Sequence, residues 1–320
     1  MKLQISNTLV VSVTGLFLFG CVENKPYRLG GIDDSEKYYG RQLPPFEQTE
    51  ASAGRVYRLS FVEFDERGDF WDRRQFGKAA REIRQSSRPV LLVIYIHGWH
   101  HNANDRKPGG KNPGDVEMFR CLLSQLAVSD SASNMQVHGV YLGWRGRLVQ
   151  GQLDYLTVWG RKAAATRIAG TPVTESIFEL IRQARKNSPE ASKCVLVGHS
   201  LGALVLEKAM AQAMTGSILA QDVQKEGGTF NAPADLVLLV NSAAESIYAK
   251  EMRDMFERIE QRGAVNPNQP LVISITSESD TATSRWFAIG TFFPNLFSIG
   301  NIIGTRISIT RVTKSIKTST

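Results

Sequence analysis

The hydrophobic positions of this chain fall into short runs and longer periodic segments, and each pattern predicts a different element. Runs that are apolar at nearly every position predict strands buried on both faces of a sheet. Such runs lie at residues 90–96, 137–144, 194–197, 236–240 and 271–275, and residues 56–65 alternate as a further strand would. Apolar residues at helical spacing, or unbroken runs of good helix formers, predict helices. These occupy residues 71–85, 171–186, 203–210 and 248–259, and one more begins at Asp115.

Strands and helices alternate along the chain within residues 55–284. That order predicts an α/β fold with a doubly wound, mostly parallel sheet that carries helices on both faces. Two stretches interrupt the alternation. Residues 145–170 have mixed character and are interpreted as a helical excursion over the sheet edge. Residues 216–235 are polar and contain glycine, so they are interpreted as a loop or lid.

The first residues of the chain predict export. Lys2 precedes an apolar run, residues 9–19, that is too short to span a bilayer as a helix but suits the core of a signal peptide. The run leads into Leu-Phe-Gly-Cys at residues 18–21, which resembles the lipobox of bacterial lipoprotein signals. The resemblance implies that residues 1–20 are a signal peptide and that Cys21 carries lipid; an ordinary secretory signal is the alternative. The expected location is the bacterial cell envelope, with a lipid anchor in a membrane.

Two flanking segments differ in composition from the predicted domain. Residues 21–54 are polar, contain several Gly and Pro residues and show no sustained periodicity, which predicts a tether. Residues 285–320 form a C-terminal extension whose last residues are basic. The extension contributes much of the formal net charge of +7. Because the chain has no zinc-finger spacing, RNA-binding aromatic signature or recognition-helix pattern, no nucleic-acid partner is expected.

The cysteines give no sign of a metal site. If Cys21 is lipidated, only Cys121 and Cys194 remain, on a predicted helix and a predicted core strand. These positions predict two buried free thiols, although an oxidising compartment would permit a disulfide. Two cysteines do not make a metal site, and no cofactor is expected.

The sequence around Ser200 carries the strongest chemical signal. The pentapeptide Gly198-His199-Ser200-Leu201-Gly202 has the pattern G-x-S-x-G and lies between a predicted strand and a predicted helix. In such a turn the serine occupies a strained backbone position, and its hydroxyl faces out at the carboxyl edge of the sheet. The amide of Leu201, at the start of the helix, can then donate to a developing oxyanion.

With this turn in place, the chain resembles the α/β-hydrolase superfamily, in particular its bacterial esterase and lipase-like members. The resemblance covers roughly residues 56–280, and it also rests on His97-Gly98-Trp99, which directly follows an earlier strand. It implies that Ser200 is the nucleophile and that the amides of Trp99 and Leu201 form the oxyanion hole, with Gly98 allowing close approach of the backbone. Gly198 and Gly202 are the small residues of the turn.

The resemblance also implies an acid after the last strand of the domain, where it would orient a histidine. Asp280 occupies that place, and Glu278 and Glu245 are nearby alternatives. The alternative is that Asp280 has no catalytic role and is a solvated loop carboxylate or a helix cap.

The histidine itself departs from the family pattern. The family's catalytic histidine follows the acid, whereas the five histidines of this chain all precede Ser200: His97, His100, His101, His138 and His199. Three explanations stay open. The C-terminal part departs from the family, or His100 or His101 reaches Ser200 from an unusual direction, or the protein binds without hydrolysing.

The expected function is therefore that of a membrane-anchored serine hydrolase, which cleaves a small-molecule ester or a lipid through an acyl-enzyme at Ser200. The alternative is a catalytically inactive envelope lipoprotein of the same fold that binds an apolar ligand or a protein partner. The missing downstream histidine is the reason to keep that alternative.

Overall fold

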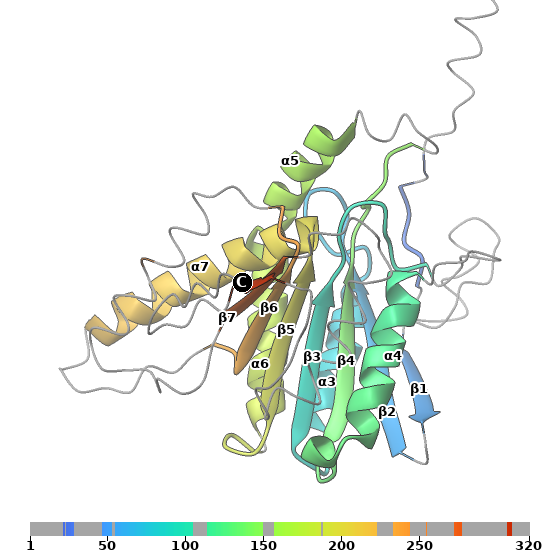
Figure 1. The fold of residues 1–320 in the computed structure, drawn as a ribbon, viewed down its shortest axis with the longest axis vertical. Helices are drawn as coiled ribbons and strands as arrows, with labels where there is room; N and C mark the ends of the chain where they lie inside the picture. The colour runs from blue at the N-terminus through green and yellow to red at the C-terminus, as the bar shows by residue number, and fades with distance from the viewer. Residues whose placement is uncertain are drawn as a thin grey trace, which may run out of the picture.

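A single twisted sheet with parallel strands at its centre organises the computed structural model of this chain (Figure 1). The structure describes residues 22, 24–28, 47–52, 55–104, 114–149, 157–186, 188–222, 233–243, 254, 272–276 and 306–308. The strands are ordered β1-β2-β4-β3-β5-β6-β7-β8 across the sheet. Their bounds are β1 (Glu47–Ser52), β2 (Arg55–Glu63), β3 (Val90–Ile96), β4 (Gln136–Gly143), β5 (Lys193–His199), β6 (Leu236–Val240), β7 (Val272–Thr276) and β8 (Arg306–Ser308).

The central strands from β2 to β7 pair in parallel, and the two edge strands pair antiparallel with their neighbours. The helices are α3 (Arg73–Arg84), α4 (Asp115–Val128), α5 (Val158–Ile168), α6 (Thr171–Lys186) and α7 (Leu201–Asp222), with a short 3-10 helix, η1 (Asp130–Ala132). The prediction of a doubly wound, mostly parallel α/β fold is therefore confirmed.

Both faces of the sheet are buried, which explains why the strands are apolar at almost every position. Alternate residues of β3 show this division: Leu92 and Ile94 enter the core beneath α3, α5, α6 and α7, whereas Val93 and Tyr95 enter the core beneath α4. In Figure 1, α4 lies in front of the sheet and α3 and α6 lie behind it. Burial from two sides leaves no polar face, as expected for parallel strands.

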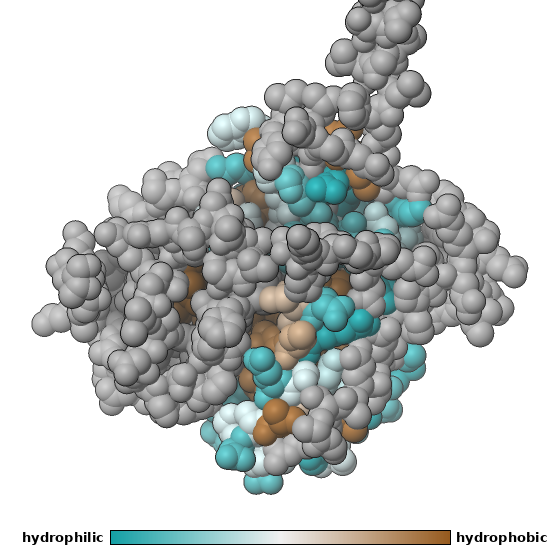
Figure 2. Space-filling view, turned by 45° about the vertical axis from the view of Figure 1, so that its right-hand side comes forward, coloured by the Kyte–Doolittle hydropathy of each residue, from teal (hydrophilic) through white to brown (hydrophobic). Residues whose placement is uncertain are grey.

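The described outer surface is mixed in character. In the space-filling view, hydrophilic residues are interspersed with hydrophobic ones over the described part of this face (Figure 2). Within the described residues, no helix is both long enough and apolar enough to cross a membrane.

The segment predicted as a tether contributes to the fold, so the prediction is wrong for the part that the structure describes. Residues 47–52 form β1, which is paired with β2. Nearer the N-terminus, the backbone amides of Tyr27 and Arg28 donate to the carboxylate of Glu63, at 2.8 and 2.6 Å. Arg28 is fully buried. The sequence pattern could not reveal β1, because an edge strand is held by backbone hydrogen bonds alone. It could not reveal the burial of Arg28 either, because a single buried residue produces no periodic pattern.

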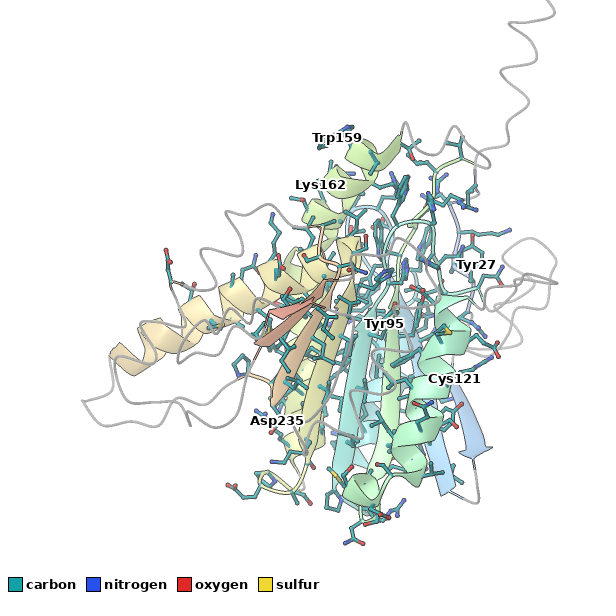
Figure 3. All side chains as sticks on the ribbon, in the orientation of Figure 1. Tyr27, Tyr95, Cys121, Trp159, Lys162 and Asp235 are labelled. Carbon is teal, nitrogen blue, oxygen red and sulfur yellow. The ribbon has the colours of Figure 1, made fainter. Side chains whose placement is uncertain are left out.

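Two further predictions need correction. Helix α7 continues to Asp222, so residues 216–222 are helical and do not belong to the predicted loop. A Cβ on Gly216 would meet nothing within 4 Å, and no proline follows to end the helix before Asp222. Cys121 is exposed on α4 and Cys194 is buried, and both thiols are free, so only Cys194 is the buried thiol expected (Figure 3).

Other element predictions agree closely with the structure. The excursion at residues 145–170 contains helix α5, as expected. The predicted helix at residues 248–259, like Cys21, lies outside the described residues except for position 254.

Candidate active site

Ser200 lies at the junction between β5 and α7, at the carboxyl edge of the sheet. Its backbone φ is 54°, in the left-handed region that non-glycine residues rarely adopt. β6 and the segment after it hold this conformation, because the Ser200 amide donates to Val240 O at 2.9 Å and the Ala243 amide donates to Ser200 O at 3.2 Å. Such strain persists only where the surroundings impose it, and it is common at functional sites. The side chain is half-buried.

Glycines allow three backbone segments to meet around Ser200. A Cβ on Gly98 would lie 2.8 Å from the Ser200 Cβ and 2.8 Å from His199 O. A Cβ on Gly202 would lie 2.1 Å from Ile96 O, and one on Gly198 would lie 2.6 Å from the Ala203 Cα. The end of β3, the end of β5 and the start of α7 are therefore packed backbone against backbone. The loop that begins at residue 97 lies directly beside Ser200.

Gly98 lies against Ser200, so the next residue, Trp99, is also close to the serine junction. Leu201 is the first residue of α7, and the first amides of a helix have no acceptor within that helix. The two predicted oxyanion donors thus flank the serine junction. Their aim at an oxyanion stays a prediction, because it depends on a bound substrate.

The loop after β3 is held from the other side by the residues after β4. The indole Nε1 of Trp144 donates to His97 O, and the Trp144 amide donates to His97 Nε2, both at 2.9 Å. The amides of His100 and Gly146 donate to Gly146 O and His101 O, each at 3.1 Å. These bonds fix the path of the loop past Ser200.

His97 is a structural residue of this loop and not a proton carrier. Its ring is fully buried and stacks on the Trp144 indole, with ring centroids 5.5 Å apart. Burial lowers the pKa of His97 to about 4. The ring is therefore neutral near pH 7, with Nε2 accepting from Trp144 and Nδ1 donating to Gly98 O at 2.9 Å.

Beside this loop the structure brings together three side chains that lie far apart in the chain. His101 Nδ1 lies 3.4 Å from Asp115 Oδ1, and His199 Nδ1 lies 3.9 Å from Asp115 Oδ2. His101 comes from the loop after β3, Asp115 from the first turn of α4, and His199 from the end of β5. Only His101 has substantial exposure, with 21% of its side chain accessible against 4% for Asp115 and 8% for His199.

The carboxylate at the centre of this cluster is ionised. Burial by itself would raise the pKa of Asp115, but the neighbouring His101 and His199 outweigh burial and hold the pKa well below its usual range. The hydroxyl of Tyr95, near the carboxyl end of β3 (Figure 3), donates to Asp115 Oδ2 at 2.8 Å. A buried negative charge is thus kept facing two imidazoles.

The cluster offers two kinds of chemistry. One ligand atom from each of His101, Asp115 and His199 lies within 4.8 Å of the others, and two imidazoles with a carboxylate suit a divalent cation such as Zn²⁺. An imidazole that faces an ionised carboxylate is also the arrangement of a general base.

His100 lies beside Trp99, and the three candidate acids lie outside the described residues. His100 has a φ of 71° and its ring lies 3.8 Å from the ring of Trp99, between centroids. Asp280, Glu278 and Glu245, the three candidate acids, lie outside the described residues. Within the described chain, no side-chain hydrogen bond of Ser200 is seen.

The sequence interpretation missed Asp115 as part of the site and predicted no metal-ligating group. A signal was present, because Asp115 begins the helix that follows the histidine-containing loop and therefore lies at the same edge of the sheet. By itself, however, Asp115 predicts only the start of a helix, since an acidic residue in the first turn is ordinary there.

The chain matches no protein-family model, and a search of curated proteins finds no significant match.

The packing around the serine junction predicts opposite effects for two glycines of the same helix. Gly202→Ala places a methyl group against backbone carbonyls of β3 and the loop after it, and we expect it to reduce the free energy of unfolding by roughly 2–3 kcal/mol. Gly216→Ala meets open space, and we expect a gain of roughly 0.5–1 kcal/mol from helix propensity. Urea denaturation of both variants measures the difference. Equal stability of the two would contradict the close packing at Gly202.

His97 predicts a pH-dependent contribution to stability. Since its pKa falls from 6.5 to about 4 on folding, the unfolded chain takes up the proton first, and this contribution is lost as pH falls from 6.5 towards 4. His97→Gln should destabilise the protein at pH 7, and by roughly 2 kcal/mol less at pH 5. Denaturant titrations of wild type and variant at both pH values measure this. A difference that is constant with pH would show that His97 is not buried as a neutral ring.

Proposed function

We propose that this protein is a serine hydrolase that cleaves carboxylic esters through an acyl-enzyme at Ser200, as a relative of the α/β-hydrolase superfamily. The observation that carries the proposal is the left-handed backbone of Ser200, φ 54°, at a strand-to-helix junction against Gly98. A strained serine at the carboxyl edge of a parallel sheet is the geometry of a nucleophile elbow.

Several features of the junction support this chemistry. The half-buried side chain of Ser200 leaves the hydroxyl at an edge where loops from three strands gather. The start of α7 supplies a positive helix end beside it. Amide donors that are fixed before substrate arrives contribute a few kcal/mol each to stabilising a tetrahedral intermediate. We take the amides of Trp99 and Leu201 as those donors.

A second function has its own support. No described imidazole is bonded to Ser200, and His97 is committed to Trp144. A catalytically inactive protein of this fold, which uses the same edge to bind an apolar ligand or a protein partner, is consistent with that observation. The two proposals differ in whether the Ser200 hydroxyl is reactive.

A fluorophosphonate probe tests the reactivity directly, because it forms a covalent bond only with an activated serine. We expect the purified soluble domain to gain one probe mass on Ser200, and Ser200→Ala to lose the labelling entirely. Hydrolysis of short p-nitrophenyl esters should fall in the same variant, to the level of the uncatalysed reaction or within 10³-fold of it.

Ser133→Ala is the matched control, since Ser133 is exposed and far from the junction in sequence. It should label as the wild type does. Labelling that survives in Ser200→Ala would place the reactive residue elsewhere and overturn the role of Ser200. A wild type that neither labels nor hydrolyses esters would favour the inactive binding protein.

We also propose that the mature chain is held at a membrane of the bacterial envelope by lipid on Cys21. Its support is the lipobox-like sequence at residues 18–21. An alkyne-tagged fatty acid fed to a bacterial host should label the full-length protein, and Cys21→Ser should abolish that label and release the protein from the membrane fraction. A Cys121→Ser variant is the control. Membrane retention without label in Cys21→Ser would contradict lipid anchoring.

A further inference from the structure

We infer that His101 is the general base for Ser200 and that Asp115 is the residue that positions it. The inference rests on the proposed hydrolase function and names the base that the order of residues along the chain does not supply. The acid then comes from the first turn of α4 and not from the segment after β7.

Of the five histidines, His101 is the one whose burial and partner suit a general base. His97 accepts a hydrogen bond from Trp144, and His138 is buried on β4, bonded to Ser60 Oγ at 2.9 Å. Burial lowers the pKa of His138 to about 3, so it is neutral and remote from the exposed edge.

His199 shares the carboxylate of Asp115 but is 8% exposed and more distant, at 3.9 Å. His100 packs on the Trp99 ring. His101 combines a carboxylate partner with access to solvent, since 21% of its side chain is exposed.

The contact atoms have the polarity that a base requires. The nitrogen that faces Asp115 is Nδ1, so an Nδ1–H directed at the carboxylate selects the tautomer in which Nε2 carries the lone pair. Asp115 is buried, and its carboxylate accepts a hydrogen bond from the Tyr95 hydroxyl at 2.8 Å. A fixed negative charge stabilises the imidazolium that forms when the ring takes a proton.

His101 lies beside the serine junction. Its ring centroid is 6.2 Å from that of His199, the residue directly before Ser200. Gly98, three residues before His101, lies against the Ser200 Cβ. Hydrogen bonds between catalytic groups are often long in free enzymes and shorten when substrate binds. The order His, Asp, Ser along the chain is also that of one class of serine protease, because a triad is defined by geometry and not by sequence order.

The reaction balances with these groups alone. Nε2 of His101 takes the Ser200 hydroxyl proton as Oγ bonds to the ester carbonyl carbon. The tetrahedral intermediate then breaks its bond to the alkoxy oxygen, which leaves as an alcohol with the proton from His101. Water gives a proton to His101 and attacks the acyl-enzyme, and that proton returns to Ser200 Oγ when the acid is released.

The rate of fluorophosphonate labelling and of p-nitrophenyl ester hydrolysis, measured from pH 5 to 9, tests the inference. His101→Ala should slow both by 10²–10⁴-fold and remove the rise in rate with pH that reports the base. Added imidazole should restore part of the rate in this variant. Asp115→Asn should slow both reactions by a similar factor and change the pH profile, because the amide no longer selects the tautomer or stabilises the imidazolium.

Ser133→Ala is again the control, because Ser133 is exposed and outside the site, and it should remain within about threefold of wild type. Circular dichroism and thermal melting confirm that each variant is folded.

If the wild type is labelled and His101→Ala is labelled equally fast, the assignment of His101 as the base is wrong while the hydrolase proposal survives. If His199→Asn abolishes the rate and His101→Ala does not, the base is misassigned. Loss of wild-type rate on chelation, with recovery on added Zn²⁺, would show that the cluster binds a metal instead. Absence of wild-type labelling overturns both proposals.

Discussion

The close contact of backbone segments around Ser200 is the constraint on which the rest of the site depends. Three glycines let the end of β3, the end of β5 and the first turn of α7 meet at distances that a side chain would not allow. Interiors as dense as this transmit small changes in shape, because they contain no free volume to absorb them. β6 and the residues after it hold both peptide groups of Ser200 in its left-handed backbone. The strain at the serine is thus balanced by the regular sheet beneath it.

The same packing determines what the histidines do. His97 directly follows β3 and is drawn into the interior, where it joins the loop after β3 to Trp144. His101 lies four residues later, beyond the point where the loop leaves the core, and therefore retains contact with solvent. Burial makes the His97 imidazole a neutral structural group, whereas the His101 imidazole faces Asp115 and is partly exposed. Two residues of the same type in one loop thus differ in both burial and partners.

Asp115 connects this loop to the other layer of the fold. It lies at the first turn of α4, which packs on the opposite face of the sheet from α7, and its carboxylate reaches back to the carboxyl edge. A buried carboxylate is costly unless it is paired and hydrogen-bonded. Two imidazoles and the Tyr95 hydroxyl supply those partners. The site therefore draws residues from both faces of the sheet, although Ser200 belongs to only one junction.

The sequence by itself determined the layered α/β architecture and the serine turn. Strand β3 was predicted to its terminal residues, because burial on both faces leaves a continuous apolar run, and Gly198 and Gly202 mark a turn too tight for larger side chains. Only the tertiary structure decided the rest: that β1 completes the sheet edge, that His97 is structural, and that Asp115 faces His101. Hydrophobic periodicity reports which side of an element is buried. It carries no information on which polar groups from distant segments meet, because that depends on how the elements cross in space.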